Sequence, residues 1–143
     1  MGAAGEVGHM IMEPGGNLCG CGQRGCLESI TGRLAIAGES SILAARQQAK
    51  HLYKEVGTEV LKMKSGVLAK AIQNGDKVLE KMIREKAKKL GLAMANLVNV
   101  LNPELIVLGG GMVESLGNLI VKEAENSMRK FAMPKLGSHV KVV

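Results

Sequence analysis

The sequence predicts a helix-rich α/β domain with a metal-binding loop at its N-terminal end. Three observations predict this class: glycine and cysteine gather near the start, apolar residues then recur at helical spacing, and a short β-branched run follows. The 143 residues are 46% hydrophobic and 22% charged, as expected for one globular domain. We expect a loop over 1–28, a helical segment over 29–102, and a strand, glycine turn, helix and strand over 103–143.

The helical segment contains one clear amphipathic helix. Apolar residues between Leu79 and Leu101 recur in steps of three and four, which places them on one buried face. We expect Asp76 to cap this helix and Asn102-Pro103 to end it. Weaker patterns predict helices after Cys26, from Ser40 or Ser41 to about Leu52, and from Ser65 to Asn74-Gly75.

The last segment alternates between strand and helix. The run Glu104–Leu108 is short, apolar and β-branched, so it predicts a buried strand that the glycines 109–111 close. A helix is expected from about Ser115 to Arg129, ended by Met133-Pro134, and a second strand begins at Val140. Because the chain opens in a glycine-rich loop and closes in a strand, we expect a piece of a longer protein.

The net charge of +6 lies on residues 50–89, which carry all of the excess of Lys and Arg over Asp and Glu. A solvated helical face explains this excess, and a nucleic-acid surface beside a zinc module is the alternative. One Tyr, one Phe and no Trp are a poor set for stacking bases. The apolar runs are too short to span a membrane, and the start does not resemble a secretory signal. We expect a cytoplasmic protein without a membrane partner.

Four residues near the start form the pattern H-x9-C-x-C-x4-C. These are His9, Cys19, Cys21 and Cys26. An odd number of cysteines in one short stretch does not suit a disulfide framework, which leaves a metal site or free thiols. Thiolates and imidazole select zinc, and four protein ligands are typical of a closed, structural site. The glycines between the cysteines allow the sharp turns that such a site needs.

At these residues the sequence resembles the ROK family (repressor, open reading frame, kinase). Gly5–His9 resembles the family's G-E-x-G-H segment, and Cys19–Glu28 resembles its C-x-C-G-x-x-G-C-x-E signature. Leu90–Leu97 and Asn102–Gly111 resemble the helix, strand and glycine turn on its nucleotide side. The resemblance implies part of an actin-like, ribonuclease-H-like lobe of a two-lobed sugar kinase. It also implies either phosphorylation of hexoses with ATP and magnesium, or sugar sensing by a repressor.

The resemblance also implies roles for individual residues. The zinc ligands would be His9, Cys19, Cys21 and Cys26, the sugar contacts would be Glu6, His9 and Glu28, and Gly109, Gly110 and Gly111 would lie near the adenosine. Simpler interpretations remain beside these roles. Glu6 could be an exposed loop carboxylate, Glu28 a favourable charge at a helix start, and the glycines only a tight turn. The isolated His51 and His139 are expected at the surface.

Two segments of the family's kinases have no counterpart in these residues. They are the phosphate-binding D-x-G-G-T segment and the E-N-D-like segment that carries the general-base aspartate. Of the glycine-rich phosphate segment before G-E-x-G-H, only Gly2–Gly5 could be the end. We therefore name no catalytic residue and expect the chain alone to be inactive. The parent is expected to be a homo-oligomeric, ATP-dependent hexose kinase; glucose is the favoured substrate, and N-acetylhexosamines, mannose and fructose are the alternatives. The alternative is the sugar-sensing domain of a repressor, for which nucleic acid would be a partner.

Overall fold

The computed structural model describes residues 5–143, so residues 2–4 of the expected phosphate segment lie outside the described residues. Helices dominate, and most charged side chains are exposed. The elements are η1 (Val7–His9), α1 (Leu27–Thr31), α2 (Arg33–Ala45), α3 (Lys50–Val56), η2 (Val60–Lys62), α4 (Ser65–Gln73), α5 (Lys77–Leu101), β1 (Leu105–Ile106), α6 (Gly111–Phe131), α7 (Pro134–Gly137) and β2 (Lys141–Val142).

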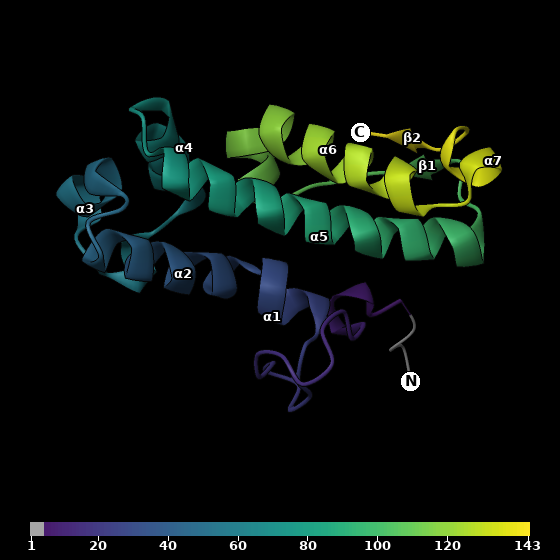
Figure 1. Cartoon of the computed structure of the whole chain (residues 1–143), viewed down its shortest axis with the longest axis horizontal. Helices are drawn as coiled ribbons and strands as arrows, with labels where there is room; N and C mark the ends of the chain where they lie inside the picture. Colours follow the sequence, from purple (N-terminus) through teal and green to yellow (C-terminus); the bar gives the residue numbers. More distant parts are fainter. Residues whose placement is uncertain (1–4) are drawn as a thin grey trace.

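The long helix α5 is the centre of the molecule. Helix α6 lies along one side of it, and α1 and α2 lie along the other side (Figure 1). The close approach of α5 and α6 depends on Gly91, because a Cβ atom there would lie 2.2 Å from the carbonyl oxygen of Ala124. Arg84 of α5 links the same two helices through an ion pair of 2.6 Å to Glu123 of α6, and it also pairs with Glu80 of its own helix at 2.7 Å.

Two groups of buried apolar side chains form the core. The first lies where α5 meets α2, α3 and α4, and its fully buried members include Leu52, Leu68 and Leu79. The second lies between the C-terminal half of α5, α6 and β2. The predicted apolar face of α5 is buried at Leu79 and most later positions, whereas Leu101 is 68% exposed. No helix of residues 5–143 combines the length and the apolar character that crossing a membrane requires.

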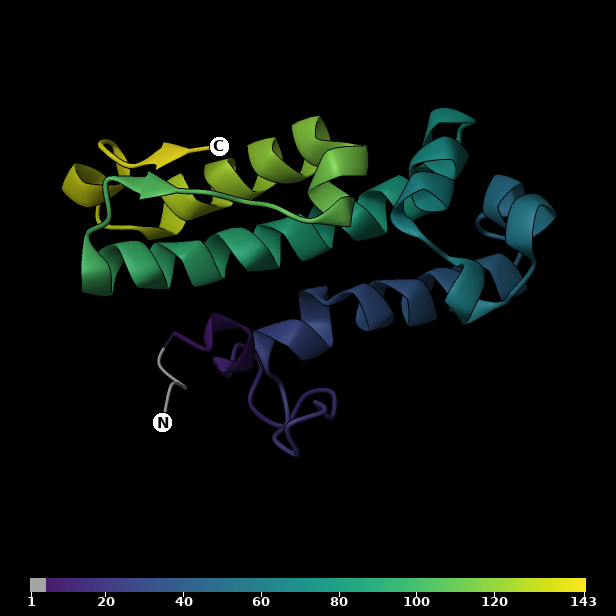
Figure 2. The same cartoon turned by 180° about the vertical axis from the view of Figure 1, so that it is seen from behind.

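The β-structure is smaller and more exposed than the sequence predicted. Strand β1 pairs in parallel with β2, and each has two residues (Figure 2). Ile106 and Leu108 pack against the second core group, but Leu105 and Val107 are 49% and 67% exposed. The prediction of a buried strand was therefore wrong for one of its faces. Successive side chains of a strand point to opposite faces. Residues 5–143 cover only the face that carries Ile106 and Leu108, so Leu105 and Val107 on the other face are exposed.

Several helix boundaries also differ from the predicted ones. Ser40 and Ser41 do not begin a helix, since α2 runs through both residues and the Ser40 side chain is buried. The helix expected to continue to about Leu52 ends at Ala45, and Leu52 belongs to α3. The helix breaks instead at Gly32, between α1 and α2. The helix expected from Ser115 begins earlier, at Gly111, and has a non-helical residue at Leu116. Tertiary packing overrode the local cap preference of serine here.

Asp76 precedes α5 as predicted, but its carboxylate caps a different helix. The backbone amides of His51 and Leu52 donate to it at 3.1 and 2.8 Å. These amides belong to the first turn of α3, whose donors have no partner within their own helix. Because it precedes α5 and accepts hydrogen bonds from α3, the buried Asp76 joins the starts of the two helices. His51 and His139 are exposed, as the sequence predicted.

Candidate metal centre

The N-terminal loop holds its shape through backbone hydrogen bonds between its two arms. The Gly25 carbonyl accepts from the amides of Met12 and Glu13 at 2.8 and 3.1 Å, and the Gly25 amide donates to Asn17 at 2.8 Å. Gly25 has a φ of +79°, and a Cβ atom there would lie 1.7 Å from the Glu13 carbonyl oxygen. Only glycine fits at this position, because both the backbone angle and the close contact exclude a side chain.

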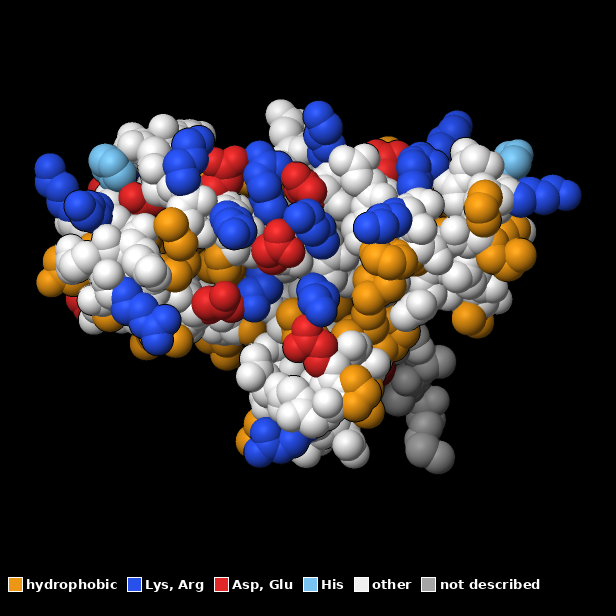
Figure 3. All heavy atoms as spheres, viewed as in Figure 1, with side chains coloured by type: hydrophobic (Ala, Val, Ile, Leu, Met, Phe, Trp, Pro, Cys, Tyr) orange, Lys and Arg blue, Asp and Glu red, His pale blue; other side chains and the backbone are white. Residues whose placement is uncertain are grey.

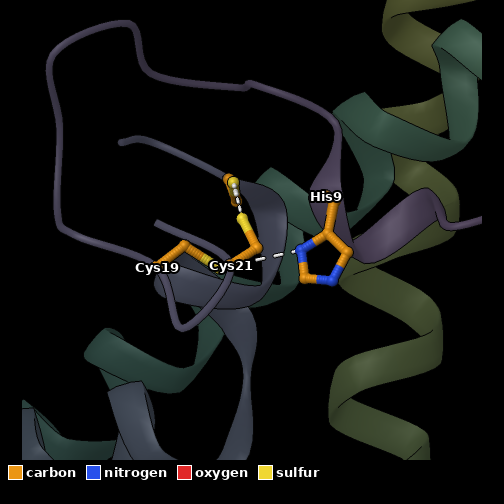
Figure 4. Close-up of side chains that lie close together, drawn as sticks. His9, Cys19 and Cys21 are labelled. Carbon is orange, nitrogen blue, oxygen red and sulfur yellow. Dashed lines mark hydrogen bonds between the residues drawn. The ribbon is translucent and has the colours of Figure 1, made fainter. Parts of the chain in front are cut away.

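This folding brings the four predicted metal ligands together. The candidate ligand atoms of His9, Cys19, Cys21 and Cys26 all lie within 4.8 Å of one another. Two pairs, Cys21 Sγ with Cys26 Sγ and Cys19 Sγ with His9 Nδ1, each lie 3.7 Å apart (Figure 4). His9 comes from η1, the first two cysteines from the tip of the loop, and Cys26 from the residue before α1. We call these four residues the metal cluster.

The distances within the metal cluster suit a tetrahedral zinc ion. Zinc bonds of about 2.3 Å to sulfur and about 2.0 Å to nitrogen put two thiolates about 3.8 Å apart, and a thiolate about 3.6 Å from an imidazole nitrogen. The two 3.7 Å pairs are close to these values. Four protein ligands of this kind would fill the coordination shell of zinc, so the site would be structural and not a Lewis acid.

The thiols of the metal cluster titrate differently because their surroundings differ. Burial raises the pKa of the Cys26 thiol to about 12, and hydrogen bonds and charge from the other two cysteines add to the rise. A backbone hydrogen bond at Gln23 lowers the pKa of the exposed Cys21 thiol below its usual value. A bound dication would favour the thiolate of every cysteine in the cluster, because it supplies the positive charge that they lack.

The structure brings one of the predicted carboxylates to the metal cluster. Glu28 Oε2 lies 3.8 Å from His9 Nδ1, on the first turn of α1. The Glu28 side chain is 59% exposed, so it is open to a ligand. Glu6 is exposed one residue before η1, and its carboxylate forms no ion pair with any of residues 5–143. Its backbone carbonyl accepts a hydrogen bond of 3.0 Å from the amide of His9.

The predicted glycine turn lies apart from the metal cluster and lines a separate cleft of about 510 Å³. Gly109, Gly110 and Gly111 line it, at the start of α6. A second hollow of about 700 Å³ is lined by Glu28 and Cys19 beside the metal cluster. The structure thus brings the metal ligands together with Glu28 and leaves the glycine turn in a neighbouring cleft.

The sequence did not indicate several residues that shape these regions. Lys89 of α5 forms an ion pair of 2.7 Å with Glu13, which ties the N-terminal loop to the central helix. Arg33 and Lys86 line both hollows. No local pattern signals these residues, because the contacts join segments far apart in the chain. On the face drawn in Figure 3, Lys and Arg side chains are interspersed with Asp and Glu, which suits a solvated surface.

Three features define the class of protein. They are a helix-rich α/β fold, a glycine-rich loop with one histidine and three cysteines, and a separate glycine turn. The ROK family model matches residues 1–143, and the chain belongs to this family. A glucokinase from Halalkalibacterium halodurans is 34% identical over 141 residues, which are 94% of this chain and 41% of the glucokinase.

Solved structures of the family show the same fold. A ROK family glucokinase from Streptomyces griseus, in complex with glucose and AMPPNP, matches with a TM-score of 0.81 and 26% identity, over 98% of this chain and 46% of its own. A ROK family transcriptional regulator, a homologue of the E. coli MLC protein, matches with a TM-score of 0.78 and 29% identity, over 98% and 34%. The chain therefore spans less than half the length of each of these relatives.

Proposed function

We propose that this chain is the zinc- and sugar-binding part of a ROK hexose kinase with an actin-like, two-lobed fold. The observation that carries the proposal is the metal cluster with Glu28 beside it, in a chain that belongs to the ROK family. The parent protein would be cytoplasmic and homo-oligomeric. It would transfer a phosphoryl group from ATP, with magnesium, to a hexose, and the similarity to glucokinases favours glucose.

Zinc would act in this site by holding the loop and not by taking part in the reaction. His9 presents Nδ1 towards the cysteines, which leaves Nε2 for a second partner. A metal on Nδ1 would fix the tautomer and the orientation of the ring, so that Nε2 could donate to a sugar hydroxyl. The metal would in this way preorganise the sugar site.

Carboxylates suit the other contacts of a hexose. Its hydroxyl groups donate hydrogen bonds, and a carboxylate accepts them strongly. Glu28 stands on α1 directly after the last metal ligand, and Glu6 stands three residues before the first one. The ordered loop would hold both carboxylates at one side of the hexose. Gly109, Gly110 and Gly111 would meet the adenosine of ATP in the neighbouring cleft.

The experiment that tests this proposal measures glucose binding and phosphoryl transfer separately. Glucose should bind to the zinc-loaded chain, and Glu28→Gln should weaken that binding about tenfold, since it removes one charge-assisted hydrogen bond. Glu59→Gln is the matched control, because Glu59 is exposed, lies outside the loop, and among residues 5–143 forms an ion pair with Lys62 alone. ATP-dependent phosphorylation is expected from the parent protein and not from this chain. A glucose affinity that changes neither on removal of zinc nor in Glu28→Gln would contradict the proposal.

The second candidate function is the sugar-sensing domain of a ROK repressor. The similarity to a ROK transcriptional regulator, with a TM-score of 0.78, favours this alternative. Such a protein would use the same metal cluster and the same sugar contacts, and its DNA would be bound elsewhere. The residues that precede this chain in the parent protein distinguish the two functions. A D-x-G-G-T segment supports the kinase, and a helix-turn-helix module supports the repressor.

A further inference from the structure

The Glu28 side chain packs against main chain that carries no side chains. A Cβ atom on Gly8 of η1 would stand 3.7 Å from Glu28 Cβ, and a Cβ atom on Gly32 would stand 3.1 Å from Glu28 Cγ. The carboxylate of Glu28 has one ion pair within residues 5–143, the contact of 3.8 Å with His9 Nδ1. Because a contact of this length holds a side chain weakly, the position of Glu28 depends on its packing at these glycines.

Gly32 makes the closer approach of the two, and it reaches the backbone of Glu28. A Cβ atom on Gly32 would stand 2.4 Å from the Glu28 carbonyl oxygen, which already accepts a hydrogen bond of 2.8 Å from the Gly32 amide. The φ of Gly32 is −66°, which any residue adopts, so the backbone angle does not require glycine here. The contact with Glu28 is therefore what excludes a side chain at this position.

The break at Gly32 determines which of the two helices would move to make room for a side chain. The Gly32 amide closes the last turn of α1 on Glu28, and its carbonyl accepts a hydrogen bond of 3.0 Å from the Ile36 amide in α2. Helix α2 has 13 residues and is anchored in the first core group by Ile36, Ala37 and Ala44, whereas α1 has five residues. A side chain at position 32 would therefore displace the turn of α1 that carries Glu28.

We propose that Gly32 is a positioning residue of the sugar site, because its bare main chain lets the Glu28 carboxylate lie beside His9. Gly32 acts through Glu28 and has no side chain to offer a ligand. It lines the same hollow as Glu28 and Cys19, so its effect is exerted next to the metal cluster. The inference rests on the proposed function, in which the Glu28 carboxylate accepts a hydrogen bond from the hexose.

The test is calorimetric titration of the zinc-loaded chain with glucose, for Gly32→Ala, Glu28→Gln and the double variant. Gly32→Ala should weaken glucose binding by about fivefold to tenfold, since the displaced carboxylate loses one charge-assisted hydrogen bond. The double variant should bind about as weakly as Glu28→Gln alone, because Gly32 has no effect once the carboxylate is gone. Two independent effects would instead multiply to a loss of about 50-fold to 100-fold.

Two further measurements separate positioning from a general loss of stability. Gly91→Ala is the matched control, because its Cβ would meet the Ala124 carbonyl oxygen at 2.2 Å in the contact between α5 and α6. It brings a comparable clash into another pair of helices, so it should change glucose affinity less than about twofold. Bound zinc should stay at one per Gly32→Ala chain, because a hydrogen bond of 2.8 Å from the Leu27 amide to the Met10 carbonyl holds the start of α1 separately.

Each of several results would overturn the inference. They are multiplied losses in the double variant, an equal loss of glucose affinity in Gly91→Ala, and loss of zinc from Gly32→Ala. A Gly32→Ala chain that does not fold, beside a Gly91→Ala chain that does, would make Gly32 a folding residue and not a positioning one. Weaker binding in Glu28→Gln with unchanged binding in Gly32→Ala would contradict this inference alone. Unchanged glucose binding in Glu28→Gln would contradict the hexose contact and, with it, the role of Gly32.

Discussion

Gly25 is the position at which the structure makes its sharpest prediction about the N-terminal loop. A Cβ atom there would stand 1.7 Å from the Glu13 carbonyl oxygen, so Gly25→Ala must push the two arms of the loop apart. The φ of +79° costs an alanine about 1–2 kcal/mol. Three backbone hydrogen bonds at this junction, worth about 0.5–1.5 kcal/mol each, would be strained or lost. They are the two that the Gly25 carbonyl accepts and the one from Gly16 to Glu13.

These contributions sum to a loss of about 2.5–6.5 kcal/mol in the free energy of unfolding. The assay is urea unfolding of the chain loaded with one equivalent of zinc. The unfolding free energy of the zinc-loaded chain includes both the stability of the metal-free loop and the free energy of zinc binding. This assay therefore reports the full destabilisation, whichever of the two the substitution weakens. Two neighbouring glycines supply matched controls that separate the close contact from the backbone angle.

Gly22→Ala has only the backbone strain, because φ is +89° and nothing lies within 4 Å, so it should cost about 1–2 kcal/mol. Gly20→Ala has neither the strain nor a close atom, and should change the unfolding free energy by less than about 0.5 kcal/mol. The order Gly25, Gly22, Gly20 in decreasing cost is the expected result. A Gly25→Ala chain as stable as Gly22→Ala would refute the reasoning, because the contact with Glu13 would then contribute nothing.

Three further predictions concern the helices and the thiols. Gly91→Ala should destabilise the chain by about 3 kcal/mol or more in urea, because its Cβ would meet Ala124 at 2.2 Å, whereas Gly38→Ala, with open space, should be neutral or stabilising. Asp76→Ala should lower the free energy of unfolding by about 3 kcal/mol, because it removes a charged cap from two amides of α3. Asp76→Asn should lower it by about half as much. An equal loss in the two variants would contradict the capping role. In the metal-free chain the raised pKa of Cys26 favours the folded loop below the ordinary thiol value of 9.0, and this contribution is lost as pH rises towards about 12. Metal-free unfolding should therefore be less favourable at pH 8 than at pH 10, and Cys26→Ala should reduce that difference. Zinc uptake near pH 7 should release protons, measurable by calorimetry in buffers of different ionisation enthalpy.

The sequence predicted features that depend on spacing within one segment. The four candidate metal ligands could be predicted from residue type and spacing, because thiols and an imidazole this close in the sequence can meet within one loop that glycine allows to turn sharply. The apolar face of α5 follows from a period that one helix sets by itself. The helix end before Met133-Pro134 follows from the covalent geometry of proline.

The remaining features depend on contacts between distant segments. Ser40 looks like a cap in the sequence, but burial in the core places it inside α2. Asp76 caps α3 because the fold returns that helix to it across 24 residues. The approach of Arg33 and Lys64 to the glycine turn has no local signal either, since that turn comes much later in the chain. A prediction from one sequence has no means of finding such pairs.

The central claim is that a zinc ion held by the metal cluster orders the sugar site. Its most direct test is elemental analysis of tightly bound zinc in the purified chain, with His9→Ala and Cys21→Ala beside it and Cys21→Ser as a less disruptive variant. One zinc per chain, reduced in each variant, is the predicted result. No zinc in a folded and reduced sample would contradict the account, and so would full zinc occupancy in the variants.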